Sequence, residues 1–149
     1  PHFLDLPNAF QSRQTKRGKF DDLCNEVLML KVAGSREYRV LKLMGDAYLK
    51  PIVYSLIKRH SGNEMLETTS HLITDNTVGS AMPLFFDKHI SAKHNIFRPN
   101  EEALISSHAK ADVVEALIEL ARVKRDTFAF LFIIEELFVL AGMGNVIGK

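Results

Sequence analysis

The sequence contains no tryptophan and a single cysteine, Cys24, among its 149 residues. One cysteine excludes an internal disulfide and any zinc site built from several thiolates. Cys24 stands between Leu23 and Val27 in a segment of helical periodicity, which predicts a buried thiol rather than a reactive one. This cysteine usage favours an intracellular or organellar location. The sequence shows no signal peptide, and its start at Pro1 suggests a processed chain or a piece of a longer one.

A strong excess of charge of either sign is also missing. The sequence contains nineteen Lys and Arg residues and eighteen Asp and Glu residues, so its formal net charge is +1. That balance excludes a nucleic-acid binder that relies on bulk positive charge, and any contact with RNA must come from local basic patches. The most apolar stretch, Thr127 to Ala141, is shorter than the about 20 residues needed to span a bilayer. We therefore expect no membrane partner.

The remaining composition is that of one globular domain, with 46% hydrophobic and 25% charged residues. No strand pattern competes with the helical periodicity, so we predict an all-α fold. Residues 1–19 form an irregular basic N-terminal arm in this prediction, 20–141 the helical domain and 142–149 a tail. In the first half of the chain, the expected helices run from Phe20 to Gly34, from Ser35 to His60 with a kink at Pro51, from Glu64 to Ile73, and from Asn76 towards Phe86. A loop is expected over 87–99. The last two helices are expected from Asn100 through a carboxylate-bearing stretch to Lys124, and from Thr127 to Ala141 after an N-cap at Asp126.

The stretch from His108 to Glu119 combines an aliphatic face with a line of acids. If this stretch and the residues up to Ala121 form one helix, one side of it carries Val114, Leu117, Ile118 and Ala121. The other side carries Asp112, Glu115 and Glu119. An ordinary solvated helix face explains this pattern, and so does a set of oxygen ligands for Mg²⁺. The helix alone does not choose between them.

A second unusual stretch runs from Leu41 to Ala47, inside another strongly apolar helix. Gly45 stands in its interior at a cost of about 1 kcal/mol relative to Ala, which indicates a close backbone approach or a functional reason. Asp46 follows at once. In the simplest interpretation Asp46 is a salt-bridge partner of Lys42 and Lys50, four residues away on either side.

Taken together, Gly45-Asp46-Ala47 and the later segment from Ala111 to Leu117 resemble the ribonuclease III family. That family carries a signature like L-E-F-L-G-D-A and a later A-D-x-x-E-A, and the resemblance covers residues 20 to 141. It implies a helical endonuclease domain that cleaves double-stranded RNA with Mg²⁺. Carried over to this chain, the metal ligands are Asp46, Asp112 and Glu115, with Asp46 and Glu115 as the catalytic pair. No double-stranded-RNA-binding domain follows in this chain.

The chain departs from the family pattern at three places. Lys42 stands where the first signature acid is expected, although the mini-ribonuclease III branch also lacks an acid there. Glu119 stands where the family usually has Gly, and it either adds a carboxylate or pairs with Lys42. Tyr38-Arg39-Val40 replaces an N-E-R sequence.

These departures leave a second interpretation open beside the Mg²⁺-dependent endoribonuclease. It is a non-catalytic ribonuclease III-like subunit of a mitochondrial ribosome, or a heterodimer partner in an RNA-processing complex. A helical interaction module with no link to RNA is a third interpretation.

The resemblance also implies a dimer, with itself or with another ribonuclease III-like chain. We expect the apolar helix from Thr127 to Ala141 and the stretch from Leu41 to Met44 to leave a patch that a monomer cannot hide. In the family, an aromatic side chain that plugs a socket on the partner usually occupies the position of Leu43. A smaller leucine predicts weaker self-association or a different partner.

Overall fold

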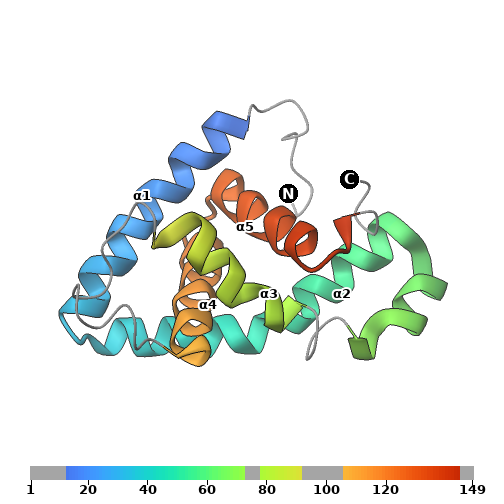
Figure 1. Ribbon diagram of the computed structural model, residues 1–149, viewed down its shortest axis with the longest axis horizontal. Coiled ribbons are helices and arrows are strands. Elements are labelled where there is room, and N and C mark those ends of the chain that lie inside the picture. Colours follow the sequence, from blue (N-terminus) through green and yellow to red (C-terminus); the bar gives the residue numbers. More distant parts are fainter. Residues whose placement is uncertain (1–12, 73–77, 92–105, 145–149) are drawn as a thin grey trace.

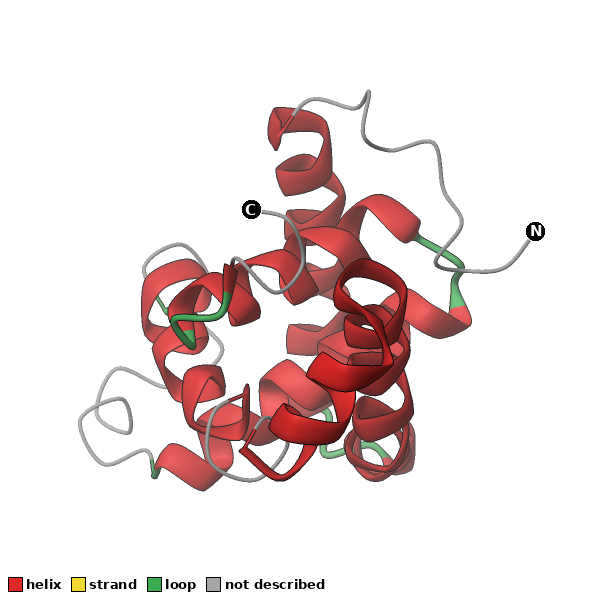
Figure 2. Ribbon diagram, turned by 90° about the vertical axis from the view of Figure 1, so that its right-hand side faces the viewer, coloured by secondary structure: helices red, strands yellow, loops and turns green. Residues whose placement is uncertain are grey.

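The computed structural model describes residues 13–72, 78–91 and 106–144. Every regular element within these ranges is a helix, and none is a strand (Figure 2). The all-α prediction is confirmed for this part of the chain. The elements are α1 (Arg13–Val32), α2 (Arg36–Leu72), α3 (Val78–Phe85), the π-helical turn η3 (Phe86–Ile90), α4 (Ser107–Val123) and α5 (Thr127–Leu140).

Helix α5 forms the centre of the domain and packs against α1, α3 and α4 (Figure 1). Its sequence is apolar almost all round, so it is stable in water only when other helices cover every side. Phe130, Ile133 and Phe138 are completely buried, and each buried side chain of this size contributes about 1.5–3 kcal/mol. Most of this helix is buried within one chain, and Val139 near its end is 47% exposed, so the expectation that the whole helix leaves an apolar patch for a partner is wrong. None of the helices in the described ranges is long and apolar enough to cross a membrane.

Helix α5 begins where its sequence predicts, and both C-terminal helices end within one residue of the predicted position. The Asp126 side chain accepts a hydrogen bond from the backbone N–H of Ala129 and caps α5. Gly142, with φ +75°, follows the end of α5, and Lys124 is the C-cap of α4. On α4, the predicted aliphatic face is buried, comprising Val114, Leu117, Ile118 and Ala121.

Three expectations about local structure are corrected. Residues 13–19 are the first turns of α1 rather than an irregular arm, since Lys, Arg and Gln are good helix formers and no proline interrupts them. Residues 87–90 are not a loop but belong to the π-helical turn η3, whose His89 and Ile90 are buried. Helix α4 begins at an N-cap made by Ser106, whose hydroxyl accepts a hydrogen bond from Ala109 N–H. The predictions for residues 1–12, Asn76, Asn100 and the tail beyond 144 lie outside the described residues.

Helix α2 joins the two segments that were predicted as separate helices, from Ser35 to His60 and from Glu64 to Ile73, and its described residues end at Leu72. Its backbone remains helical at Pro51, and the residue with non-helical angles is Gly62, with φ 87° and ψ 174°. The break therefore falls between the two helices that the sequence predicted, which end at His60 and begin at Glu64. Only the segment before that break contributes to the site described next.

Candidate functional site

Helices α2 and α4 cross at Gly45 with their backbones in direct contact. A Cβ atom on Gly45 would lie 2.0 Å from the carbonyl oxygen of Glu115 and 2.7 Å from its carbonyl carbon. Any side chain would therefore force the two helices apart, because both contacts are with backbone rather than with a flexible side chain. The close approach expected from a glycine in this helix is confirmed. It sets Asp46, the next residue, beside Glu115.

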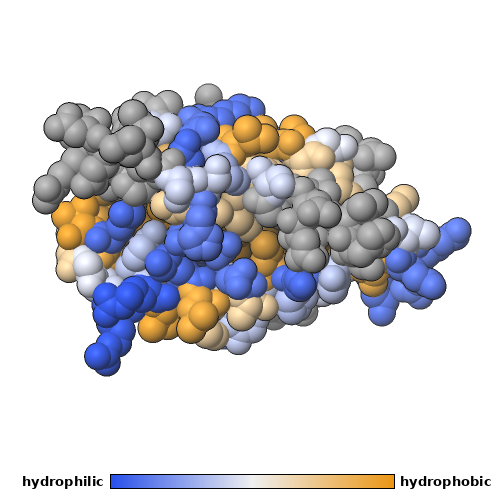
Figure 3. Space-filling model, turned by 60° about the horizontal axis from the view of Figure 1, so that its bottom comes forward, coloured by the Kyte–Doolittle hydropathy of each residue, from blue (hydrophilic) through white to orange (hydrophobic). Residues whose placement is uncertain are grey.

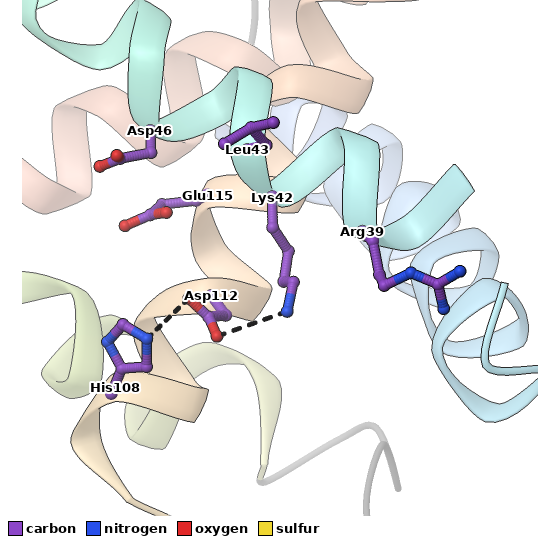
Figure 4. Close-up of a pocket in the computed structure, with 7 residues that line it drawn as sticks. All are labelled: Arg39, Lys42, Leu43, Asp46, His108, Asp112 and Glu115. Carbon is purple, nitrogen blue, oxygen red and sulfur yellow. Dashed lines mark ion pairs between the residues drawn. The ribbon is translucent and has the colours of Figure 1, made fainter. Parts of the chain in front are cut away.

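An open pocket of about 420 Å³ lies beside the crossing of α2 and α4 (Figure 4). The three acids singled out in the sequence all lie on it, Asp46 from α2 and Asp112 and Glu115 from α4. The carboxylates of Asp46 and Glu115 lie side by side and point the same way (Figure 4). The complete lining consists of Arg39, Lys42, Leu43, Asp46, His108, Asp112 and Glu115.

The surroundings of Glu115 in this pocket raise its proton affinity. The pKa of Glu115 rises from 4.5 to about 7, first because the carboxyl is partly buried and then because Asp46 and Asp112 are close. Lys42 acts in the opposite direction and lowers it. Burial also raises the pKa of the Tyr38 hydroxyl, to which the charges of Asp112 and Glu115 add. Lys42 therefore offsets only part of the effect of burial and of the two neighbouring acids on Glu115.

Lys42 reaches across the helix crossing to Asp112. Its Nζ atom lies 3.7 Å from Oδ2 of Asp112 and 5.3 Å from the centre of the Tyr38 ring. The simplest sequence interpretation paired Lys42 with Asp46 on the same helix, and the structure instead pairs it with an acid of α4. No ion pair of Asp46 occurs within the described ranges.

His108 and Arg39 also line the pocket, and sequence reasoning did not assign them to it. His108 Nε2 lies 3.7 Å from Oδ1 of Asp112, and its side chain is 89% exposed. Arg39 extends away from the acids (Figure 4). A signal for both was present in the sequence, because His108 stands four residues before Asp112 and Arg39 three before Lys42.

Glu119 does not join the other acids, which corrects both expectations for it. Its side chain is buried and accepts two hydrogen bonds from Arg122, at 2.6 Å from Nε and 3.1 Å from Nη2. The Arg122 guanidinium stacks on the Tyr48 ring of α2 at 4.0 Å. Four residues make slightly more than one helical turn, so Glu119 is rotated away from the pocket towards Tyr48. It neither adds a carboxylate to the pocket nor pairs with Lys42.

The predicted Mg²⁺ ligands match the ion in chemistry but not in arrangement. Carboxylate oxygens are the donors that Mg²⁺ prefers, and it requires near-ideal octahedral geometry. No group of three or more His, Cys, Asp or Glu side chains that could hold a metal ion occurs within residues 13–72, 78–91 and 106–144. Lys42 instead contributes an ammonium group at Asp112. The Mg²⁺ site therefore stays a prediction.

Comparisons with protein-family models, curated proteins and solved structures find no match to this chain. The ribonuclease III family therefore remains a resemblance carried by the two motifs and their order. Asp46 of the first motif and Asp112 and Glu115 of the second line one pocket.

Proposed function

We propose that this chain is a non-catalytic ribonuclease III-like domain that binds double-stranded RNA. In this proposal it serves as a structural subunit of a ribosome, for instance a mitochondrial one, or as a heterodimer partner in an RNA-processing complex. The observation that carries the proposal is the ammonium of Lys42 at Asp112, inside the pocket where the motifs would hold a metal. RNA as the ligand and the class of assembly follow from the motif resemblance alone.

The position of Lys42 opposes a divalent cation in the same pocket. At about 6 Å and an effective dielectric constant of about 20, an ammonium repels a doubly charged ion by about 5 kcal/mol before salt screening. The side chain would have to leave Asp112 for a metal to bind. Glu119 offers it no alternative partner, because that carboxylate is buried and bonded to Arg122. Lys42 therefore acts as the internal counter-ion of the pocket.

A Mg²⁺-dependent endoribonuclease is the second candidate, and a specific observation favours it. Asp46, Asp112 and Glu115 come from two separate motifs, yet they line one pocket whose acids are incompletely neutralised. In this candidate Asp46 and Glu115 are the catalytic residues, and Asp112 is the third metal ligand once Lys42 is displaced.

A cleavage assay on long double-stranded RNA decides between the two candidates. The wild-type protein should retard the RNA on a native gel and leave it intact at every Mg²⁺ concentration. Lys42→Glu and Asp46→Asn test the pocket, and Lys58→Ala on the exposed side of the same helix is the control for loss of one positive charge. Cleavage by the wild type that Asp46→Asn abolishes would overturn the proposal and establish the nuclease. Failure to bind RNA would refute both candidates.

The proposal also includes a partner chain, which we expect to contact Leu43. The side chain of Leu43 is 70% exposed next to the acid pocket, whereas Leu41 is buried. Because α5 is buried within the chain, the dimer prediction now rests on this part of α2. Figure 3 shows the α2 side of the molecule, where apolar patches are bordered by hydrophilic surface.

Sedimentation of the wild type and of Leu43→Lys tests this contact. We expect the wild type to self-associate weakly and the variant to be monomeric with unchanged thermal stability. A wild type that is monomeric at high concentration excludes the homodimer and leaves a heterodimer. Self-association that survives Leu43→Lys would show that another surface is responsible.

A further inference from the structure

A cavity of about 350 Å³ lies at the other end of α4 from the acid pocket. Lys19 of α1 borders it on one side, and the turn that joins α4 to α5 borders it on the other. Three of its six lining residues are cations from two separate segments of the chain. The lining consists of Lys19, Lys124, Arg125, Asp126, Thr127 and Phe128.

The lining of this cavity carries three cations and one acid, so its net charge is positive. Lys124 forms an ion pair with Glu26 of α1. The carboxylate of Asp126 is directed to the first turn of α5, where it accepts a hydrogen bond of 3.2 Å from Ala129 N–H. Lys19 and Arg125 have no ion-pair partner among the residues that the structure describes. The cavity is therefore suited to an anion, in contrast to the acid pocket.

Arg125 adopts a backbone conformation that usually belongs to glycine. Its φ is +54°, and the turn closes with hydrogen bonds from Arg125 N–H to Arg122 O and from Asp126 N–H to Ala121 O. Glycine is the common residue at this position of a helix end, and Gly34 and Gly142 occupy it after α1 and α5. A left-handed residue with a side chain costs about 1–2 kcal/mol. Arg125→Gly therefore removes the positive charge and, at the same time, the energetic cost of the left-handed backbone.

We infer that this cavity binds a phosphate of the RNA backbone, with Lys19 and Arg125 as its cationic contacts. The inference rests on the proposed function for RNA as the ligand. The planar guanidinium of Arg125 matches the oxygens of a phosphate in a bidentate fashion. The first turns of α1 extend the basic sequence beyond Lys19 with Arg13, Lys16 and Arg17. Asp112 and Lys124 stand about 18 Å apart along α4, so the RNA contact is separate from the acid pocket.

Binding of a double-stranded RNA oligonucleotide as a function of salt concentration tests the inference. Arg125→Gly and Lys19→Ala should each weaken binding several-fold and reduce the slope of log affinity against log salt by about 1, as loss of one phosphate contact requires. Arg125→Gly should at the same time raise the melting temperature. If Arg125 only stabilised the fold, its removal would lower the melting temperature instead. Lys58→Ala should leave both the affinity and the slope at wild-type values.

Two outcomes overturn the inference, and they are distinguishable from failure of the proposed function. If the wild type binds the RNA and both cavity variants bind it equally well, the RNA contact lies elsewhere and the proposed function stands. If the wild type does not bind the RNA, the proposed function fails. A titration with inorganic phosphate, followed through the amide resonances of Thr127 and Phe128, then shows whether the cavity takes free phosphate. If phosphate shifts these resonances in the wild type and not in Arg125→Gly, the cavity binds free phosphate. That result would overturn the inference that its ligand is a phosphate of the RNA backbone.

Discussion

Acidic side chains occupy two different environments in this protein, the interior and the pocket between α2 and α4. In the interior, Glu136 of α5 lies 2.8 Å from His89 Nε2 and 3.4 Å from Lys88 Nζ. Glu119 is bonded twice to Arg122. In the pocket, the ion pairs of Asp112 with Lys42 and His108 are both 3.7 Å long. The interior acids are held at hydrogen-bond distance, and the pocket acids are not.

This difference separates acids that maintain the fold from acids that are available to a ligand. A buried carboxylate is tolerated only when its partners satisfy it directly, and the aromatic rings of Phe85 and Phe132 enclose the imidazole of His89. The pocket acids remain partly exposed, and burial together with the charges of Asp46 and Asp112 raises the pKa of Glu115. A cation, a partner chain or a proton can therefore change the state of the pocket without disturbing the interior.

The largest expected effect comes from removing an interior acid. Glu136→Ala leaves His89 buried without this carboxylate, and we expect a loss of about 3–5 kcal/mol in the free energy of unfolding. Denaturation with urea measures the loss. Asp46→Ala, which removes a pocket acid, should cost less than about 0.5 kcal/mol or stabilise the protein. Equal losses in the two variants would abolish the distinction between the environments. If Glu136→Ala does not fold, Glu136→Gln provides the same comparison.

The helix crossing gives the next largest effect. In Gly45→Ala the added methyl group collides with the backbone of Glu115, so we expect a net loss of about 2–3 kcal/mol even though alanine is the better helix former. Gly34→Ala is the control, because its Cβ would meet nothing within 4 Å and only the left-handed backbone penalises it, by about 1 kcal/mol. A Gly45→Ala protein as stable as the wild type would contradict the direct backbone contact.

The pH dependence of stability reports on Glu115. Its folded-state pKa of about 7 is higher than the ordinary 4.5, so the folded protein binds the proton more tightly than the unfolded chain does. The contribution of Glu115 is then fully present below pH 4.5 and is lost as the pH rises to about 7. Glu115→Gln should match the wild type near pH 4 and exceed its stability at pH 8 by about 1 kcal/mol, a value reduced for solvent exposure. A constant difference across this range would show that Glu115 does not titrate there.

The smallest effect separates Lys42 from an ordinary surface lysine. Lys42→Met removes the cation that lowers the pKa of Glu115, so at pH 8 we expect a loss of about 0.5–1 kcal/mol. Below pH 5 the loss should shrink, because Glu115 is then neutral in both proteins. Lys58→Ala should change stability at neither pH. A Lys42→Met variant that is more stable at pH 8 would refute the counter-ion role.

The sequence predicted the parts of this fold that depend on one helix at a time. Periodicity identified the buried face of α4, the residue type at 126 indicated the cap of α5, and the cost of a mid-helix glycine indicated the close contact at Gly45. Relations between helices were less accessible. The partner of Lys42 lies on α4, and spacing along α2 alone pointed to Asp46. The rotation of Glu119 towards Tyr48 depends on how α2 and α4 cross. Nor did the sequence indicate the His89–Glu136 pair, whose members lie on separate helices.

The contact between Gly45 and Glu115 also bears on the order in which the domain assembles. It joins positions roughly seventy residues apart in the chain, and contacts between such distant positions form slowly because a long segment must first be closed into a loop. During synthesis, α2 has no α4 to pack against until residues 107–123 have emerged. A completed acid pocket is therefore a mark of a chain whose folding has progressed through α4, and a nascent chain that stops earlier presents Asp46 without its counterparts.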